Sequence, residues 1–283
     1  MRYLYTLILT LLTPFVLLRL LWRGRRNPGY WHRWDERFGF ICPPASRDPI
    51  WVHAVSVGEV QAAVPLVHRL AETYPERDLV VTTTTPTGSS RVQALFGESV
   101  FHCYLPYDLP APVNRFLRRT HPTIAVIMET ELWPNLFAAC ERKGVPVLLA
   151  NARLSPKSAV GYRRFAVLTR QTLESIRLIA AQSEADAERF RSLGAPRVET
   201  AGNVKYDLQL PGGIVEKALT LRQQWGVERP VWIAASTHEG EEAAVLDAFA
   251  RVRRQHSDCL LILVPRHPER FERTAELCTQ RGY

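Results

Sequence analysis

Short apolar segments alternate with amphipathic ones along most of this 283-residue chain, and this alternation is the feature that most constrains its fold. The apolar segments are rich in β-branched residues and end in polar turns, which is typical of buried strands. In the first part of the chain we expect strands at 50–55, 78–85, 123–128, 145–150 and 178–181. We expect helices at 61–70, 132–143, 163–175 and 185–193, and a turn at 86–90 that opens a helix toward Phe96. Repeated strand–helix units predict an α/β fold in which a doubly wound parallel sheet is covered on both faces.

The first of these units, Trp51 to Glu59, reads Trp-Val-His-Ala-Val-Ser-Val-Gly-Glu. Ser56 and Gly58 suit a tight turn between strand and helix, and Glu59 lies just beyond that turn. Open α/β sheets bind ligands where strand ends meet helix starts, so a carboxylate there is well placed to accept a proton. The alternative is that Glu59 only favours the helix N-terminus through the helix dipole.

A second unit is expected to begin near residue 208, where Pro211-Gly-Gly213 reads as part of a linker. Strands are expected at 230–235 and 259–264, and helices at 241–254 and 271–280. Two strands fall short of the four to six that are usual in a sheet. We therefore expect a Rossmann-like domain over 23–207 and the truncated start of a second one over 208–283.

The first 22 residues form an apolar stretch that ends in the basic cluster Arg23-Gly-Arg-Arg26. The stretch is close to the minimum for a membrane-spanning helix, and the tryptophans after it suit a lipid headgroup layer. The positive-inside rule places the basic cluster and the rest of the chain in the cytoplasm. We expect a membrane anchor at 1–22, either spanning or lying in the interface; the alternative is a buried core helix.

Composition excludes several other classes of protein. The formal net charge of +8 permits a nucleic-acid-binding protein, but much of the excess lies just after the apolar stretch, which favours membrane lipids as the partner. The five cysteines form no Cys-x-x-Cys pair and the histidines no His-Glu-x-x-His motif, so no metal site is expected. Neither a Walker A motif nor a Gly-x-Gly-x-x-Gly motif is present.

Polar side chains follow the expected strands in both units. Each alone suits a cap or a turn, but together they outline the edge where a doubly wound sheet binds ligands. Lys205 and Arg266 supply positive charge suited to phosphate or carboxylate. Only one of Glu129 and Glu131 need face this edge, and the other could cap the helix that follows. The set comprises Ser56, Glu59, Thr84, Thr87, Glu129, Glu131, Asn151, Arg153, Lys205, Ser236, His238 and Arg266.

Several longer strings resemble the 3-deoxy-D-manno-octulosonic acid (Kdo) transferases of lipopolysaccharide synthesis, and they occur in the order found in that family. They are His53-Ala-Val-Ser-Val-Gly-Glu59, Thr84-Thr-Pro-Thr-Gly88, Tyr104-Leu-Pro-Tyr-Asp108, Met128-Glu-Thr-Glu-Leu-Trp-Pro-Asn135, Asn151-Ala-Arg-Leu-Ser155, Ser236-Thr-His-Glu-Gly-Glu241 and Pro265-Arg-His-Pro-Glu-Arg-Phe271.

The resemblance implies a GT-B glycosyltransferase that needs no metal or other cofactor. The donor would be CMP-Kdo and the acceptor a lipid A precursor (lipid IVA) at the cytoplasmic face of the bacterial inner membrane. By the family pattern Glu59 is the general base, and Glu129 and Lys205 support the transition state. Pro265 and Arg266 match part of the CMP site.

Substrate contacts are also expected from Ser56, Gly58, Ser236 and His238, at the strand ends of the two units. The family continues past residue 283 with further nucleotide-binding loops. The alternative to an active transferase is therefore an inactive, truncated, membrane-associated remnant of one.

Overall fold

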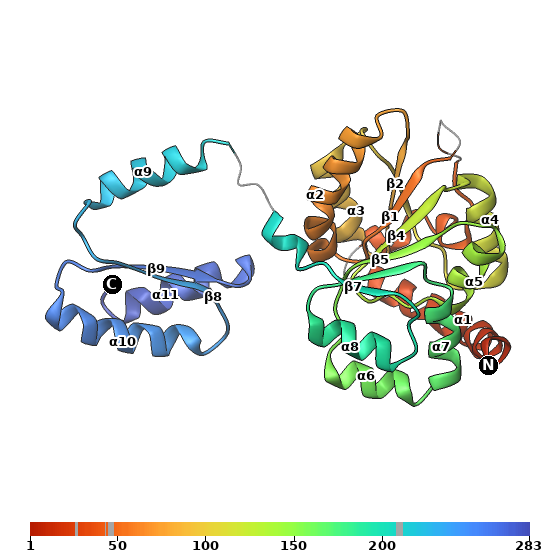
Figure 1. Ribbon diagram of the computed structural model, residues 1–283. Coiled ribbons are helices and arrows are strands. Elements are labelled where there is room, and N and C mark those ends of the chain that lie inside the picture. Colours follow the sequence, from red (N-terminus) through yellow and green to blue (C-terminus); the bar gives the residue numbers. More distant parts are fainter. Residues whose placement is uncertain (26–27, 43, 45–47, 208–211) are drawn as a thin grey trace. The chain divides into compact units, whose positions relative to one another are not determined.

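The computed structural model describes residues 1–25, 28–42, 44, 48–207 and 212–283, and these form two compact units (Figure 1). The division between the units falls between residues 209 and 210. The predicted linker lies largely outside the described residues, as does Arg26 of the basic cluster. Each unit is described by itself below.

The first unit is built on a parallel sheet of seven strands in the order β3-β2-β1-β4-β5-β6-β7. The order reverses beside β1, as in a doubly wound fold, so the predicted fold class is confirmed. The strands are β1 (Ile50–His53), β2 (Leu79–Thr83), β3 (Phe101–Tyr104), β4 (Ile124–Met128), β5 (Val147–Ala152), β6 (Leu178–Ala181) and β7 (Val198–Thr200).

Helices cover both faces of this sheet. Helices α2 and α3 lie on one side of the strands and α4 and α5 on the other (Figure 1). The helices of the unit are α1 (Arg2–Gly24), α2 (Val57–Thr73), α3 (Pro86–Phe96), α4 (Pro110–Thr120), α5 (Pro134–Arg142), α6 (Pro156–Arg163), α7 (Ala166–Glu174) and α8 (Glu184–Ser192).

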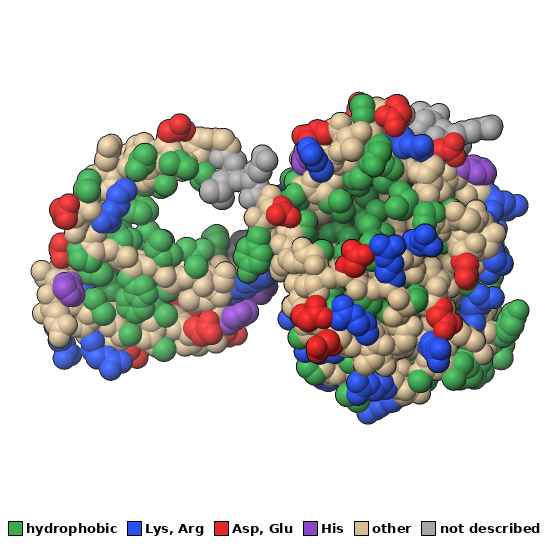
Figure 2. All heavy atoms as spheres, in the orientation of Figure 1, with side chains coloured by type: hydrophobic (Ala, Val, Ile, Leu, Met, Phe, Trp, Pro, Cys, Tyr) green, Lys and Arg blue, Asp and Glu red, His purple; other side chains and the backbone are tan. Residues whose placement is uncertain are grey.

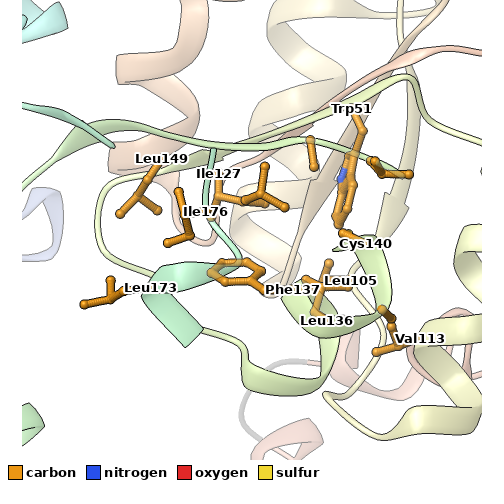
Figure 3. Close-up of a cluster of buried hydrophobic side chains, with 14 of the residues drawn as sticks. Trp51, Leu105, Val113, Ile127, Leu136, Phe137, Cys140, Leu149, Leu173 and Ile176 are labelled. Carbon is orange, nitrogen blue, oxygen red and sulfur yellow. The ribbon is translucent and has the colours of Figure 1, made fainter. Parts of the chain in front are cut away.

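Two apolar cores lie on the two faces, because successive strand residues point to opposite sides. Val52 of β1 packs with α2 and α3, while its neighbour Trp51 packs on the other face. The Trp51 ring meets the edge of Phe116 at a centroid distance of 4.9 Å. Figure 3 shows this second core, in which Phe137 of α5 lies among side chains from the sheet and from α7. These fully buried rings fix α4 and α5 against the strands that end at the candidate site.

The apolar N-terminal segment forms α1, which is long and apolar enough to cross a membrane by length and composition. Little of it is buried, so the alternative of a core helix is wrong. The helix lies against α5 of the first unit.

The second unit pairs two parallel strands, β8 (Val231–Thr237) and β9 (Leu260–Pro265). Its helices are α9 (Ile214–Trp225), α10 (Glu241–Gln255) and α11 (Phe271–Gln280). Leu246 and Phe249 of α10 are buried within this unit. A salt bridge of 2.8 Å between Arg270 and the buried Glu242 lies at the end of the strands, where Glu242 also accepts a hydrogen bond from Thr237.

Candidate functional site

The turn between β1 and α2 holds the carboxylate of Glu59 in a fixed place. Ser56 is the N-cap of α2, and its hydroxyl oxygen faces the Glu59 backbone N–H at 3.5 Å. The Ser56 hydroxyl donates to Glu59 Oε1 at 3.0 Å, and the Val55 N–H donates to Glu59 Oε2 at 2.8 Å. This is a capping box, with the side chain reaching one residue further back than usual. Glu59 is only 8% exposed, and each oxygen keeps a second lone pair for another donor.

Glu59 belongs to a group of three acidic side chains at the carboxyl ends of β1 and β4. Burial raises the pKa of Glu59 and the charge of Glu129 adds to this, although hydrogen bonds from Val55 and Ser56 oppose it. Burial also raises the pKa of Glu131 to about 7, and the charges of Glu59 and Glu129 act in the same direction. Carboxylates that bind protons this tightly suit acid–base chemistry near neutral pH.

The loop after β4 positions the other two glutamates. Glu129 has a left-handed backbone with φ of 57°, which is uncommon for a residue with a side chain, and its N–H donates to the Ala150 carbonyl at 2.8 Å. The Thr130 hydroxyl donates to the Arg153 carbonyl. Strand β4 therefore ends at Met128. The side chains of Glu129 and Glu131 do not continue the alternation between the two faces of the sheet.

The suggestion that one of these glutamates caps the following helix is wrong. Asp108, which lies after β3, accepts the N–H groups of Asn135 at 3.0 Å and Leu136 at 2.7 Å at the start of α5. A residue 27 positions earlier thus satisfies the helix end, which frees both glutamates from that role.

Lys205 lies on the short 3₁₀ helix η3 (Val204–Asp207), which rests against α2. Asn151 at the end of β5 accepts the Val204 N–H at 3.2 Å and so fixes this segment to the sheet edge. Lys205 itself is exposed, and among the described residues none of the ion pairs joins it to a carboxylate. The structure thus brings η3 to the helix that carries Glu59 and leaves the ammonium group accessible.

Ser56 and Gly58 play different parts in the turn between β1 and α2. Ser56 is engaged by the capping box, whereas Gly58 is exposed. A Cβ atom built at Gly58 would meet nothing closer than Ser56 Oγ at 3.9 Å, so packing does not require glycine there. Because Gly58 has no side chain, the space beside the turn that holds Glu59 stays open.

Five buried polar atoms at this edge have no hydrogen-bond partner among the described residues, and sequence reasoning had named only one of these residues, Asn151, as a candidate. They are Arg37 Nε, His53 Nε2, Tyr107 OH, Trp133 Nε1 and Asn151 Nδ2. His53 ends β1, Tyr107 follows β3, and Trp133 precedes α5. Leaving such a group unpaired costs about 1–3 kcal/mol, and a bound polar molecule can recover this. Four of the five lie within the family-like strings, which is the signal that could have found them.

The remaining candidates lie together in the second unit, at the carboxyl ends of β8 and β9. Ser236 is the penultimate residue of β8, one position beyond the expected strand 230–235, and its φ is 60°. The Arg266 N–H donates to the Thr237 carbonyl at 2.9 Å, next to the buried Pro265. The His238 N–H donates to Glu241 Oε2 at 2.7 Å. The side chains of Arg266 and His238 are exposed and free to meet a ligand.

Within the described parts of the chain, His, Cys, Asp and Glu form no group of three that could hold a metal ion. The acidic side chains at the edge of the first sheet influence one another through their charges, and Glu59 accepts hydrogen bonds from the Val55 N–H and the Ser56 hydroxyl.

Comparison with known proteins identifies what this arrangement resembles. Residues 32–208 match the family described as 3-deoxy-D-manno-octulosonic-acid transferase (kdotransferase). The chain is 43% identical over its whole length to the 3-deoxy-D-manno-octulosonic acid transferase of Haemophilus influenzae and covers 67% of that protein. It is 36% identical to the transferase of the same name from Bordetella pertussis over 97% of this chain and 66% of that protein. The chain thus spans about two thirds of the length of these relatives.

Solved structures show the same fold at low sequence identity. The UDP-GlcNAc 2-epimerase from Neisseria meningitidis, bound to UDP-GlcNAc, matches 82% of this chain and 69% of its own with a TM-score of 0.55 and 12% identity. A putative UDP-N-acetylglucosamine 2-epimerase from Listeria monocytogenes covers 84% of this chain and 67% of its own with a TM-score of 0.54 and 13% identity. These likenesses establish a GT-B-like fold.

Proposed function

The chain belongs to the 3-deoxy-D-manno-octulosonic acid (Kdo) transferase family of glycosyltransferases, and from this premise we propose that it transfers Kdo from CMP-Kdo to a lipid A precursor. The transfer is a step of lipopolysaccharide biosynthesis and takes place at the cytoplasmic face of the bacterial inner membrane. The observation that carries this proposal is the Glu59 carboxylate, which is held over a strand–helix turn beside two further glutamates.

In the proposed reaction Glu59 is the general base. A hydroxyl group of the acceptor attacks the anomeric carbon of Kdo, and its proton passes to a free lone pair of the Glu59 carboxylate. The bond between the anomeric carbon and the phosphate oxygen breaks, and its electron pair leaves with CMP. Glu59 suits the task because its raised pKa favours proton uptake, while the hydrogen bonds from Val55 and Ser56 keep the carboxylate oriented.

Charged groups around the base serve the other parts of the reaction. Glu129 lies close enough to raise the pKa of Glu59, and its charge supports the positive charge that develops on the sugar. Lys205 has an exposed ammonium group on η3 and compensates the charge that develops on the leaving phosphate. Both roles follow the family pattern.

The strand ends of the second unit are proposed to bind the donor. Arg266 and His238 present exposed polar side chains at the carboxyl ends of adjacent parallel strands, the place where open α/β sheets bind nucleotides. Pro265 and Ser236 complete the set. A guanidinium group binds a phosphate through paired hydrogen bonds, which favours Arg266 as the main phosphate contact.

Incubation of the purified protein with CMP-Kdo and a tetraacylated lipid A precursor tests the proposal. The expected product is the acceptor extended by Kdo, with CMP released in equal amount. Release of CMP without change in the acceptor would indicate hydrolysis instead. Absence of both from this chain, with activity in a chain extended to the length of its relatives, would identify the 283 residues as an inactive remnant.

A further inference from the structure

Helix α1 has two different faces along its whole length. One face is buried or half-buried against the first unit and repeats every three or four residues, as expected for a helix that lies on a surface. It comprises Tyr5, Thr6, Leu9, Thr13, Val16, Leu17, Leu20 and Gly24. The opposite face is exposed and apolar and comprises Leu4, Leu7, Ile8, Leu11, Leu12, Phe15, Leu18, Leu21 and Trp22. In Figure 2, hydrophobic side chains stand at the surface near the N-terminal end of α1.

The first turn of α1 is fixed to the start of α5. The Thr6 hydroxyl donates to Asn135 Oδ1 at 3.0 Å, and the Tyr5 hydroxyl is hydrogen-bonded to the carboxylate of Asp108. Asp108 is 3% exposed and also holds the N-terminal N–H groups of α5, so this turn is tied to a buried polar centre.

The last turn of α1 packs against the residues that follow the helix. Leu20 is buried, and a Cβ atom built at Gly24 would lie 1.8 Å from the Trp31 ring nitrogen, so the chain packs closely against itself there. The Trp31 ring N–H donates to the Leu21 carbonyl at 3.1 Å, and the Arg23 guanidinium stacks over Tyr30 at 4.8 Å.

The attachment of the first turn excludes a spanning orientation. From Tyr5 to Gly24 the helix is about 28 Å long, close to the thickness of the hydrocarbon core. A helix that crossed would place its first and last turns on opposite sides of the bilayer. The first turn packs on the start of α5, and the chain after the last turn continues into the same unit, so a crossing helix would draw the start of α5 and the loop before it into the lipid, where exposed irregular backbone is not tolerated.

We propose that α1 lies in the plane of the membrane interface, with its apolar face in an anionic lipid surface and its other face on the first unit. The inference rests on the membrane association proposed above. Charge complementarity identifies the lipid surface as the occupant, because the helix has no acidic residue and Arg19, Arg23 and Arg25 are exposed at its C-terminal end.

This orientation places the candidate site next to the lipid. The first turn of α1 contacts Asn135, the second residue of α5, and α5 begins just after the loop that carries Glu129 and Glu131. The membrane helix is thus joined through Asp108 and Asn135 to the edge where the proposed base lies. A lipid acceptor would reach the glutamates from the surface in which α1 is embedded.

A short protease-cleavable epitope tag before Met1 tests the orientation. In-plane binding predicts that protease removes the tag from inverted vesicles and leaves it intact in spheroplasts, because Met1 lies on the same side as the folded units. Removal only in spheroplasts would show a spanning helix and overturn the inference while leaving membrane association intact. Protection on both sides until detergent is added would overturn it too. Recovery of the chain in the soluble fraction would instead refute the membrane association itself.

Two matched substitutions test which face meets the lipid. Phe15→Glu on the exposed face should lower partitioning onto vesicles of anionic phospholipid roughly tenfold or more, the effect of withdrawing one large apolar side chain from lipid. Thr13→Ala, on the face toward the first unit, should leave partitioning unchanged. Equal effects of the two would contradict the assignment of the faces. Efficient cross-linking between copies that carry Leu11→Cys, in vesicles at low protein density, would assign the apolar face to a second copy and overturn the inference.

Discussion

Replacing Asp108 by alanine should destabilise the first unit and loosen the start of α5. Asp108 Oδ2 and Oδ1 accept the N–H groups of Asn135 and Leu136 at 3.0 and 2.7 Å in a buried setting. Alanine leaves both donors without a partner, and each buried orphan costs about 1–3 kcal/mol. We therefore expect the free energy of unfolding to fall by about 2–4 kcal/mol at pH 7.

The pH dependence gives this prediction a second, independent readout. Burial raises the pKa of Asp108 to about 6 from an ordinary value of 3.8, although the two N–H groups oppose the rise. Between these two values the folded protein binds the proton more tightly than the unfolded chain, so the contribution of Asp108 to stability falls as the pH rises. The loss caused by Asp108→Ala should therefore be greater at pH 4 than at pH 7, by up to about 3 kcal/mol.

Urea unfolding of the first unit and hydrogen exchange of the Asn135 and Leu136 amides measure the two effects. Both amides should exchange faster in Asp108→Ala and remain protected in the control Asp207→Ala, which removes an exposed aspartate. A decrease in the free energy of unfolding of less than 0.5 kcal/mol at both pH values would refute the capping role of Asp108. A decrease that is larger at pH 7 than at pH 4 would refute the stated cause of its raised pKa.

Three further changes probe the site. Glu129→Gln removes the charge that helps to raise the pKa of Glu59, so the acidic limb of the pH profile of kcat/KM should move to lower pH; an unmoved limb would exclude electrostatic coupling between the two. Tyr107→Phe deletes a buried hydroxyl that has no partner, so the urea midpoint should stay the same or rise, and a loss above 1 kcal/mol would reveal a structural hydrogen bond. In a chain extended to the length of its relatives, Arg266→Ala should weaken donor binding by about 1.5–3 kcal/mol. The exposed control Arg254→Ala should not, and equal donor affinity of the two variants by calorimetry would reduce Arg266 to a surface charge.

The sequence predicted most of the core strands because their apolar periodicity is strong. The expected segments 50–55, 123–128 and 178–181 each contain an observed strand, and the helix expected to run toward Phe96 is α3, which already begins at Pro86 where a turn was expected. Strand β7 (Val198–Thr200) was not predicted, because it is a short edge strand with exposed polar side chains. Strand β3 (Phe101–Tyr104) contains a histidine and lacks β-branched residues, so local composition gave no signal.

Long-range contacts explain what else the sequence could not predict. Helix α4 was not predicted, because it begins with Pro110 and Pro112 and proline usually ends a helix. Proline is nevertheless well suited to the first turn of a helix. The N–H groups at the start of α5 are capped by Asp108, which precedes α4 in the sequence. No local sequence pattern predicts a cap from so far away. The order of the strands, and hence the meeting of Glu59 with Glu129 and Glu131, depends on the pairing of β1 with β4 across 70 residues of chain.

The central claim is that Glu59 is the general base, and Glu59→Gln tests it most directly. A glutamine oxygen can accept the Val55 N–H while its amide group donates to Ser56, so the capping box survives and stability should change by less than about 1 kcal/mol. A glutamine cannot accept a proton at neutral pH, so transfer should fall by about 10²–10⁴.

Asp186→Asn provides the matched control, because Asp186 occupies the same capping-box position in α8 and is similarly buried. The decisive measurement is turnover from CMP-Kdo to a tetraacylated lipid A precursor, at saturating donor and acceptor, for both variants of an active chain. The account predicts that Glu59→Gln loses turnover and keeps its stability, whereas Asp186→Asn, which keeps its capping position but loses the ion pair with Arg189, keeps turnover once folded. Near-normal turnover by Glu59→Gln would contradict the account and move the role of base to Glu129.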